Sequence, residues 1–217
     1  MKNVNRLCAV FLMTTGMAIS APIYVNGAPN TISGNESTAF LQAEDFTLSS
    51  LTLLTGVRFW AFYFNDVAAG YLGSVDWGIY SDNSGKPGSV LFSGLATPVV
   101  TAGAANCCAA IDAKLEFALP NAELAAGTYW LALHNGPAFQ SGFEDFYWQT
   151  TNANVTSPGM QQTSPFGNGS WATTNLEHAF ELDGRLVQVA SADVPEPSTF
   201  ILSGLAFVVV ALRRRFR

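Results

Sequence analysis

Alternation of apolar and polar side chains with a period of two is the feature that most restricts the fold of this chain. In several short runs every second residue is apolar, and clusters of Gly, Asn, Pro and Asp separate the runs. This pattern is typical of β-strands joined by tight turns. Inside the body no run has the spacing of an amphipathic helix. The strongest runs are residues 53–64, 74–80, 115–119, 127–134, 143–151 and 176–189.

The alternation also indicates which side chains point inward. In residues 53–64, Phe59 and Ala61 share one face and Trp60 and Phe62 share the other, so this strand is expected to be buried on both sides. We predict an all-β fold of roughly eight to ten strands in two sheets packed face to face.

Turn formers define the connections between the expected strands. Residues 81–88 (SDNSGKPG) are expected to turn a hairpin between residues 74–80 and 89–92. Residues 29–37 and 152–170 are polar and are expected to be loops. Pro120 is expected to end the strand that contains residues 115–119.

The N-terminus has the pattern of a secretory signal peptide. Lys2 and Arg6 precede an apolar region at residues 7–19, and small residues follow. Cleavage is expected before Ala21 or before Ala28, and we assign residues 1–27 to the signal peptide with its helix. Residues 28–192 then form the ectodomain, and residues 193–217 form a separate C-terminal segment.

That C-terminal segment has three parts in a fixed order. Val194, Pro195, Glu196 and Pro197 form an extended turn, because each proline removes a backbone donor and disfavours helix at the preceding residue. An uncharged run at residues 200–212 follows, and as a hydrophobic helix it would span roughly 20 Å against a hydrocarbon core of about 30 Å. The third part is a basic end that includes Arg213, Arg214 and Arg215. A buried helix of a soluble domain fits these arginines poorly.

Together these three parts resemble the PEP-CTERM sorting signal of Gram-negative bacteria. The resemblance implies export across the inner membrane, transient anchoring there, and processing by the membrane enzyme exosortase near residues 195–197. It also implies a cell-surface or extracellular location and an association with extracellular polysaccharide, as in biofilms. The hydrophobic segment then anchors the protein in the membrane for a short time and allows the processing enzyme to recognise it.

A second resemblance covers about residues 39–186. The hairpin Ile79-Tyr80-Ser81-Asp82 with Pro-Gly, followed later by a strand that reads Ala-Gly-Thr-Tyr-Trp-Leu, is similar to the jelly-roll-like β-sandwich ectodomains that precede such tails. This resemblance implies a fold and gives no activity.

Charge and cysteine content restrict the partners. Between Ala28 and Pro195 there are four basic and fifteen acidic residues, a balance of −11, which repels nucleic acid. The exported part retains only Cys107 and Cys108. They are adjacent, so a vicinal disulfide would be strained, and two thiols or intermolecular bonds are the alternatives.

The sequence offers few catalytic candidates. The body histidines are His134 and His178, and no G-x-S-x-G motif occurs. Glu144 and Asp145, beside an aromatic strand, are the most suggestive carboxylates for a glycoside hydrolase. We therefore expect a protein that is not an enzyme and needs no cofactor, and a hydrolase is the least favoured alternative.

Binding is the better supported alternative. Tyr147, Trp148 and Trp171 are candidate carbohydrate contacts, together with Tyr80, because they lie at strand ends or in polar surroundings. A structural calcium ion held by oxygen ligands near the hairpin is a further expectation; its candidate ligands are Asp76, Asp82 and Asn83. The sequence predicts an exported, exosortase-processed surface or matrix protein, with a carbohydrate-binding module as the alternative.

Overall fold

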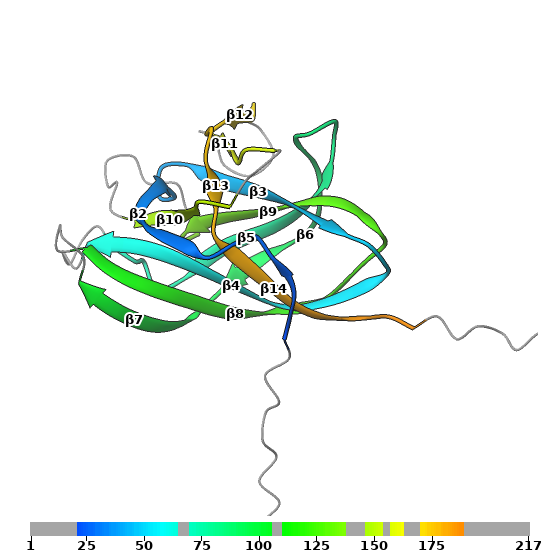
Figure 1. Ribbon diagram of the computed structural model, residues 1–217, viewed down its shortest axis with the longest axis horizontal. Helices are drawn as coiled ribbons and strands as arrows, with labels where there is room; N and C mark the ends of the chain where they lie inside the picture. Colours follow the sequence, from blue (N-terminus) through cyan, green and yellow to red (C-terminus); the bar gives the residue numbers. More distant parts are fainter. Residues whose placement is uncertain are drawn as a thin grey trace, which may run out of the picture. The chain divides into compact units, whose positions relative to one another are not determined.

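The chain folds into β-strands throughout the part that the computed structural model describes, which comprises residues 21–64, 70–105, 110–137, 146–153, 157–162 and 170–188 (Figure 1). These residues contain fourteen strands and no helix. The expected N-terminal and C-terminal helices lie outside the described residues. Residues 1–187 form one unit and residues 188–217 a second, and only the first is described further. The predicted all-β class is confirmed.

The first sheet is organised around the long strand β4 (Thr52–Phe64). On one side β4 pairs antiparallel with β14 (Phe180–Leu186) and, further along, with β10 (Phe146–Thr151). On the other side it pairs with β8 (Ala110–Leu124), which pairs in turn with β7 (Val99–Ala105). Three peripheral strands complete this sheet: β1 (Pro22–Val25) beside β14, and β2 (Pro29–Glu36) and β13 (Glu177–His178) beside β10.

The second sheet has six strands in the order β12-β11-β3-β9-β5-β6. Its antiparallel centre is made by β3 (Leu41–Leu48), β9 (Gly127–Asn135) and β5 (Val75–Asp82). The edge strand β6 (Pro87–Ala96) forms a hairpin with β5. At the opposite edge lie two short strands, β11 (Met160–Gln162) and β12 (Ala172–Thr173).

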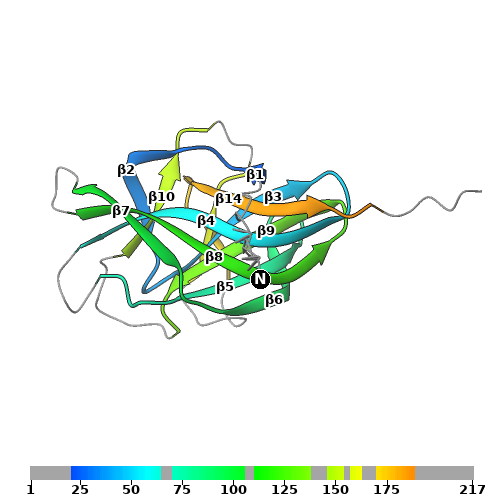
Figure 2. The ribbon, with the colours of Figure 1, turned by 90° about the horizontal axis from the view of Figure 1, so that it is seen from below.

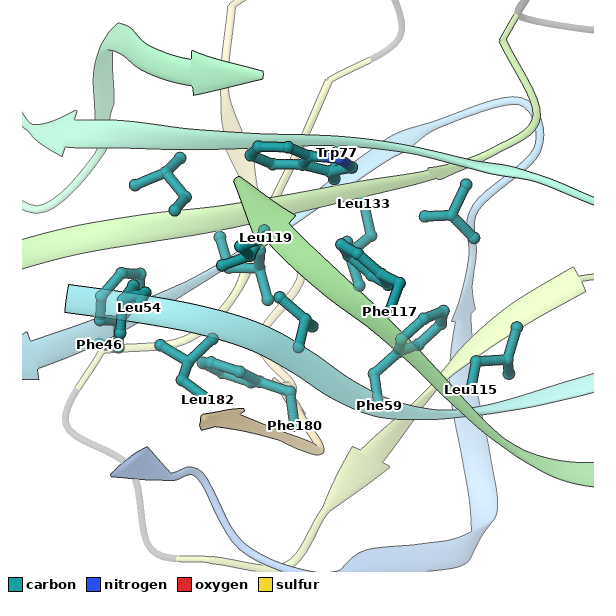
Figure 3. Close-up of a cluster of buried hydrophobic side chains, with 14 of the residues drawn as sticks. Phe46, Leu54, Phe59, Trp77, Leu115, Phe117, Leu119, Leu133, Phe180 and Leu182 are labelled. Carbon is teal, nitrogen blue, oxygen red and sulfur yellow. The ribbon is translucent and has the colours of Figure 1, made fainter. Parts of the chain in front are cut away.

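The main core lies between the two sheets. Figure 3 shows side chains from both sheets meeting there, among them Phe59 from β4 and Trp77 from β5. Phe59 is fully buried and Trp77 is 3% exposed. Alternation therefore produces the expected sandwich, because the apolar positions of each strand face the other sheet.

A second, smaller cluster lies on the opposite face of the second sheet. Strand alternation turns Tyr80 and Trp130 away from the main core, and both are buried. Met160 on β11 and Trp171 pack against this cluster. β11 and Trp171 therefore cover part of this face, and Trp171 lies beside Tyr80.

Two expectations about loops are wrong. Residues 29–37 were expected to be a loop, but β2 occupies most of this range because its backbone pairs with β10. Pro120 was expected to end a strand, but β8 continues to Leu124. The register shifts between Leu54 and Gly56 on β4, so Pro120 lies in a bulge where the ladder needs no donor from it.

On the outer face of the first sheet, the positive charge of Arg58 on β4 offsets the negative charges of its acidic neighbours. Its guanidinium contacts Glu116 (Nε to Oε1, 2.6 Å), Glu181 and Asp183, which lie on the two neighbouring strands. Burial alone would raise the pKa of Glu116, but hydrogen bonds from Arg58 and Lys114 lower it below its usual value. One cation thus joins three strands of this sheet.

Candidate functional site

A surface cavity of about 730 Å³ opens between the β5–β6 hairpin and Trp171. In Figure 1 this hairpin and the β11–β12 pair project on the same side of the sandwich. The cavity combines aromatic, hydroxyl, amide and carboxylate groups. Its lining residues are Tyr80, Ser81, Asp82, Asn83, Pro87, Gly88, Ser89, Val90, Gln162 and Trp171.

Asp82 stabilises the hairpin that forms one wall of the cavity. Its carboxylate accepts hydrogen bonds from the backbone N–H of Gly85 at 3.1 and 3.3 Å, and Asn83 N–H donates to Lys86 C=O at 2.8 Å. Ser84 (φ 56°) and Gly85 (φ 79°) adopt the left-handed conformation that the turn requires. Asp82 Oδ1 also accepts from the indole Nε1 of Trp130 at 2.9 Å, which ties the hairpin to the sheet.

Two buried polar atoms of the residues beside the cavity have no hydrogen-bond partner in the part of the chain that the structure describes. They are the hydroxyl of Tyr80 and Nε2 of Gln162, and the two residues are each 2% exposed. Burial, followed by the charge of Asp76, raises the pKa of Tyr80 to about 12, so its hydroxyl keeps its proton. A buried donor without a partner costs about 1–3 kcal/mol, so each group would gain from an acceptor that a small side-chain movement brought within reach.

Trp171 forms the aromatic side of the cavity. Its ring stands edge-on to the ring of Tyr80, with 5.7 Å between centroids and an angle of 86°. Trp171 is only half-buried, whereas Tyr80 beneath it is buried. The edge-on contact fixes the indole while part of it stays open to solvent.

The other aromatic candidates lie elsewhere. Trp148 was expected to be an exposed contact, but this is wrong, because it is fully buried in the main core and its indole N–H donates to Ala179 C=O at 2.9 Å. Tyr147 is half-buried on β10 of the first sheet. The structure therefore brings Trp171 together with Tyr80 and Asp82, and does not bring it together with Tyr147 and Trp148.

The expected calcium ligands do not converge. Asp76 and Asp82 lie near opposite ends of β5, and six residues of strand separate their α-carbons by about 20 Å. Asp82 already supports the turn and the indole of Trp130. In the described part of the chain, no group of three or more His, Cys, Asp or Glu side chains is arranged to hold a metal ion.

A buried cluster of Glu44, Glu177 and His178 was missed by sequence reasoning. His178 is fully buried; its backbone N–H donates to Glu44 Oε2 (2.7 Å), and its Nδ1 shares a hydrogen bond of 2.8 Å with the same oxygen. Burial lowers the pKa of His178 to about 3, so the ring is neutral. Burial and the neighbouring Glu44 carboxyl raise the pKa of Glu177 to about 8, and burial raises that of Glu44 well above its usual range. The two carboxyl groups therefore hold at least one proton at neutral pH.

From the raised carboxyl pKa values in this cluster, we predict that the protein loses stability as pH rises. A carboxyl whose pKa is raised in the folded state stabilises the fold below its unfolded value of about 4.5, and that contribution is lost as pH rises through about 8. Below about pH 6.5 His178 opposes this trend, because its lowered pKa makes stability rise with pH, so we expect the Tm of the wild-type protein to fall by several degrees between about pH 7 and pH 9. In Glu177→Gln, which needs no proton, we expect a flatter profile.

Scanning calorimetry across this pH range measures the effect. Glu123→Gln, a change of an exposed glutamate at the end of β8, is the control and is expected to keep the wild-type slope. Equal slopes for wild type and Glu177→Gln would show that Glu177 does not control the pH dependence.

Of the remaining candidates, one makes contacts that support the fold, and the others lie outside the described residues. His134 is 1% exposed, and its ring nitrogens lie 2.8 Å from the carbonyl oxygens of Gly136 and Thr38. Glu144, Asp145, Cys107, Cys108 and the sorting residues from Val194 to Arg215 lie outside the described residues.

Comparison with known families indicates how the protein is sorted. Residues 193–215 match the PEP-CTERM protein-sorting motif. This motif marks an exported extracellular protein of Gram-negative bacteria with exosortase as its processing partner. No curated protein and no solved structure matches the chain. Among the described residues there is no helix long and apolar enough to cross a membrane.

Proposed function

We propose that this protein is a non-catalytic component of an extracellular polysaccharide layer, and that its β-sandwich binds a neutral glycan in the cavity beside Trp171. The observation that carries the proposal is the combination of a half-exposed indole with polar groups in one cavity on an exported protein. Concave sites with one apolar wall and a few directed polar groups are typical of small-ligand recognition.

Each part of the cavity suits one property of a sugar ring. The open indole of Trp171 offers an apolar surface for the C–H face of the ring. Asp82 carries carboxylate oxygens that accept hydrogen bonds from sugar hydroxyls. Gln162 Nε2 and the Tyr80 hydroxyl lie just beneath this surface without a partner in the described part of the chain, so a small side-chain movement would offer either as a donor.

The charge of the protein favours a neutral glycan over an acidic one. Among the described residues that line the cavity there is no Lys or Arg, and Asp82 stands in its wall. The exported body has a balance of −11, which adds long-range repulsion of a uronic-acid polymer. A neutral hexose polymer meets no such repulsion.

Replacing Trp171 by Ala tests the proposal. We expect the affinity for a neutral polysaccharide to fall by at least about 30-fold, since truncating a central aromatic contact costs about 2 kcal/mol or more. Affinity electrophoresis in gels that contain glucans, mannans, galactans or alginate measures the change. Tyr147→Ala, which alters a half-buried aromatic residue on the other sheet, is expected to migrate like wild type. Retardation that Tyr147→Ala abolishes and Trp171→Ala leaves intact would place binding on the first sheet instead.

Delivery to that layer completes the proposal. The C-terminal segment holds the exported protein at the inner membrane until exosortase processes it near residues 195–197, and the sandwich is then released. The sorting motif supports this route, and the acidic sandwich is suited to remain soluble after release.

A further inference from the structure

Strand β1 is part of the sandwich, although it lies within the segment first assigned to the signal peptide. It pairs antiparallel with β14, beside which it lies in Figure 2. Tyr24 lies opposite Leu182, and Val25 lies opposite Glu181. In the order β1-β14-β4, it covers the edge of β14 that would otherwise leave backbone donors and acceptors unpaired. Residues 22–25 therefore complete the first sheet.

The side chains of β1 also cover the main core. The ring of Tyr24 lies 5.5 Å from that of Phe180 and 5.9 Å from that of Phe46, both of which are fully buried. Ile23 packs against the same cluster. The Tyr24 hydroxyl donates to Asn26 Oδ1 at 2.9 Å, which links the strand to the residue that follows it.

Asn26 and Gly27 continue this attachment beyond the strand. Asn26 N–H donates to Phe180 C=O at 2.9 Å, and its side-chain Nδ2 donates to His178 C=O at 3.0 Å and to Glu177 Oε2 at 3.4 Å. Gly27 has a φ of 103°, and a Cβ on it would lie 2.5 Å from Thr151 Oγ1. Glycine is therefore required at this position by both the backbone and the packing.

We propose that signal peptidase cleaves the Ser20–Ala21 bond, so that the mature protein begins at Ala21 and keeps β1. In this hydrolysis the amide C–N bond breaks, water supplies hydroxide to the Ser20 carbonyl carbon and a proton to the Ala21 nitrogen, and a free α-amino group results. Cleavage before Ala28 would instead remove the seven residues 21–27. That product would expose the edge of β14 and the rings of Phe46 and Phe180.

The sequence around residue 20 is compatible with this site. Ala18 and Ser20 provide the small residues that signal peptidase requires at the third and first positions before the cut. Residues 7–13 (LCAVFLM) suffice as an apolar region of the usual minimum length of about seven residues. Residues 14–20 (TTGMAIS) then form the more polar stretch that leads to the cut.

N-terminal sequencing of the protein exported from a Gram-negative host tests the proposal with the full chain. We expect the sequence to begin Ala-Pro-Ile-Tyr-Val. Ser20→Tyr places a bulky side chain directly before the proposed cut, and we expect the uncleaved precursor to accumulate. Val25→Tyr disables the alternative site before Ala28 but changes an exposed, strand-compatible side chain, so we expect wild-type processing.

The readout does not depend on whether a variant folds, because the N-terminal sequence and the precursor mass are measured directly. A mature N-terminus at Ala28, or precursor accumulation in Val25→Tyr with normal processing of Ser20→Tyr, would overturn the proposal. Glycan binding and C-terminal processing are not involved in either outcome.

Discussion

Trp148→Ala is expected to destabilise the sandwich by about 3–5 kcal/mol, the usual cost of truncating a buried tryptophan. Trp148 is fully buried, and its ring lies 6.1 Å from Phe59, 5.9 Å from Phe180 and 4.5 Å from the ring of His178. The change would also leave Ala179 C=O without its indole donor. For a body of this size, we expect the Tm to fall by about 10 °C in thermal unfolding followed by circular dichroism.

Trp148→Phe keeps the measurement informative if the alanine variant does not fold. It retains a ring against Phe59 and Phe180 but removes the hydrogen bond to Ala179, so an intermediate loss is expected. Trp60→Phe, at a half-buried position of β4, is the matched control and is expected to stay close to wild type. A Tm of Trp148→Ala within about 2 °C of wild type would contradict the buried position of this residue.

Deletion of residues 195–197 is expected to abolish release of the protein from the cell. These residues supply the Pro-Glu-Pro part of the matched sorting motif. Without them, exosortase lacks its recognition sequence while the apolar run and Arg213 remain. We expect immunoblots of fractionated cells to show the protein in the inner membrane and not in the medium.

A second deletion controls for chain length. Residues 189–191 lie between the end of β14 and the matched motif at 193–215, so their removal shortens the chain equally and leaves both intact. We expect this variant to be released as the wild type is. Normal release of the 195–197 deletion would show that processing does not require the Pro-Glu-Pro sequence.

Alternation predicted the fold well because the sandwich separates the two faces of each strand. In the expected strand at residues 74–80, the alternate residues Val75, Trp77 and Ile79 all lie in the main core. The run at residues 53–64 was expected to be buried on both sides, and Phe62 on its outer face is 6% exposed, although Trp60 is half-buried. The local sequence pattern is sufficient here because side chains two residues apart in a strand lie on the same face of the sheet.

The errors in the fold have a common physical cause. β2 is rich in polar turn formers, and only its pairing with β10 makes it a strand. Pro120 interrupts the sequence pattern, but it lies at a β-bulge, where β8 has extra residues opposite β4. Both features depend on a partner strand that is distant in sequence, and tertiary pairing overrides local preference.

The site was only partly predictable. Asp82 and Trp171 were identified, because turn chemistry and a polar environment are visible in the sequence, whereas Gln162 lies in a stretch that was expected to be a surface loop. Glu44 left a signal that could have been used: it shares its strand face with the core residue Phe46. An acidic residue at an inward position of a strand predicts a buried partner, in this case His178.

Isothermal titration of the released protein with neutral polysaccharide purified from the extracellular layer of its own host tests the central claim most directly. We predict saturable binding that is weakened at least about 30-fold in Trp171→Ala and is unchanged in Tyr147→Ala. The absence of measurable heat with the wild-type protein at any temperature tested, or equal affinity for wild type and Trp171→Ala, would contradict glycan binding in the cavity beside Trp171.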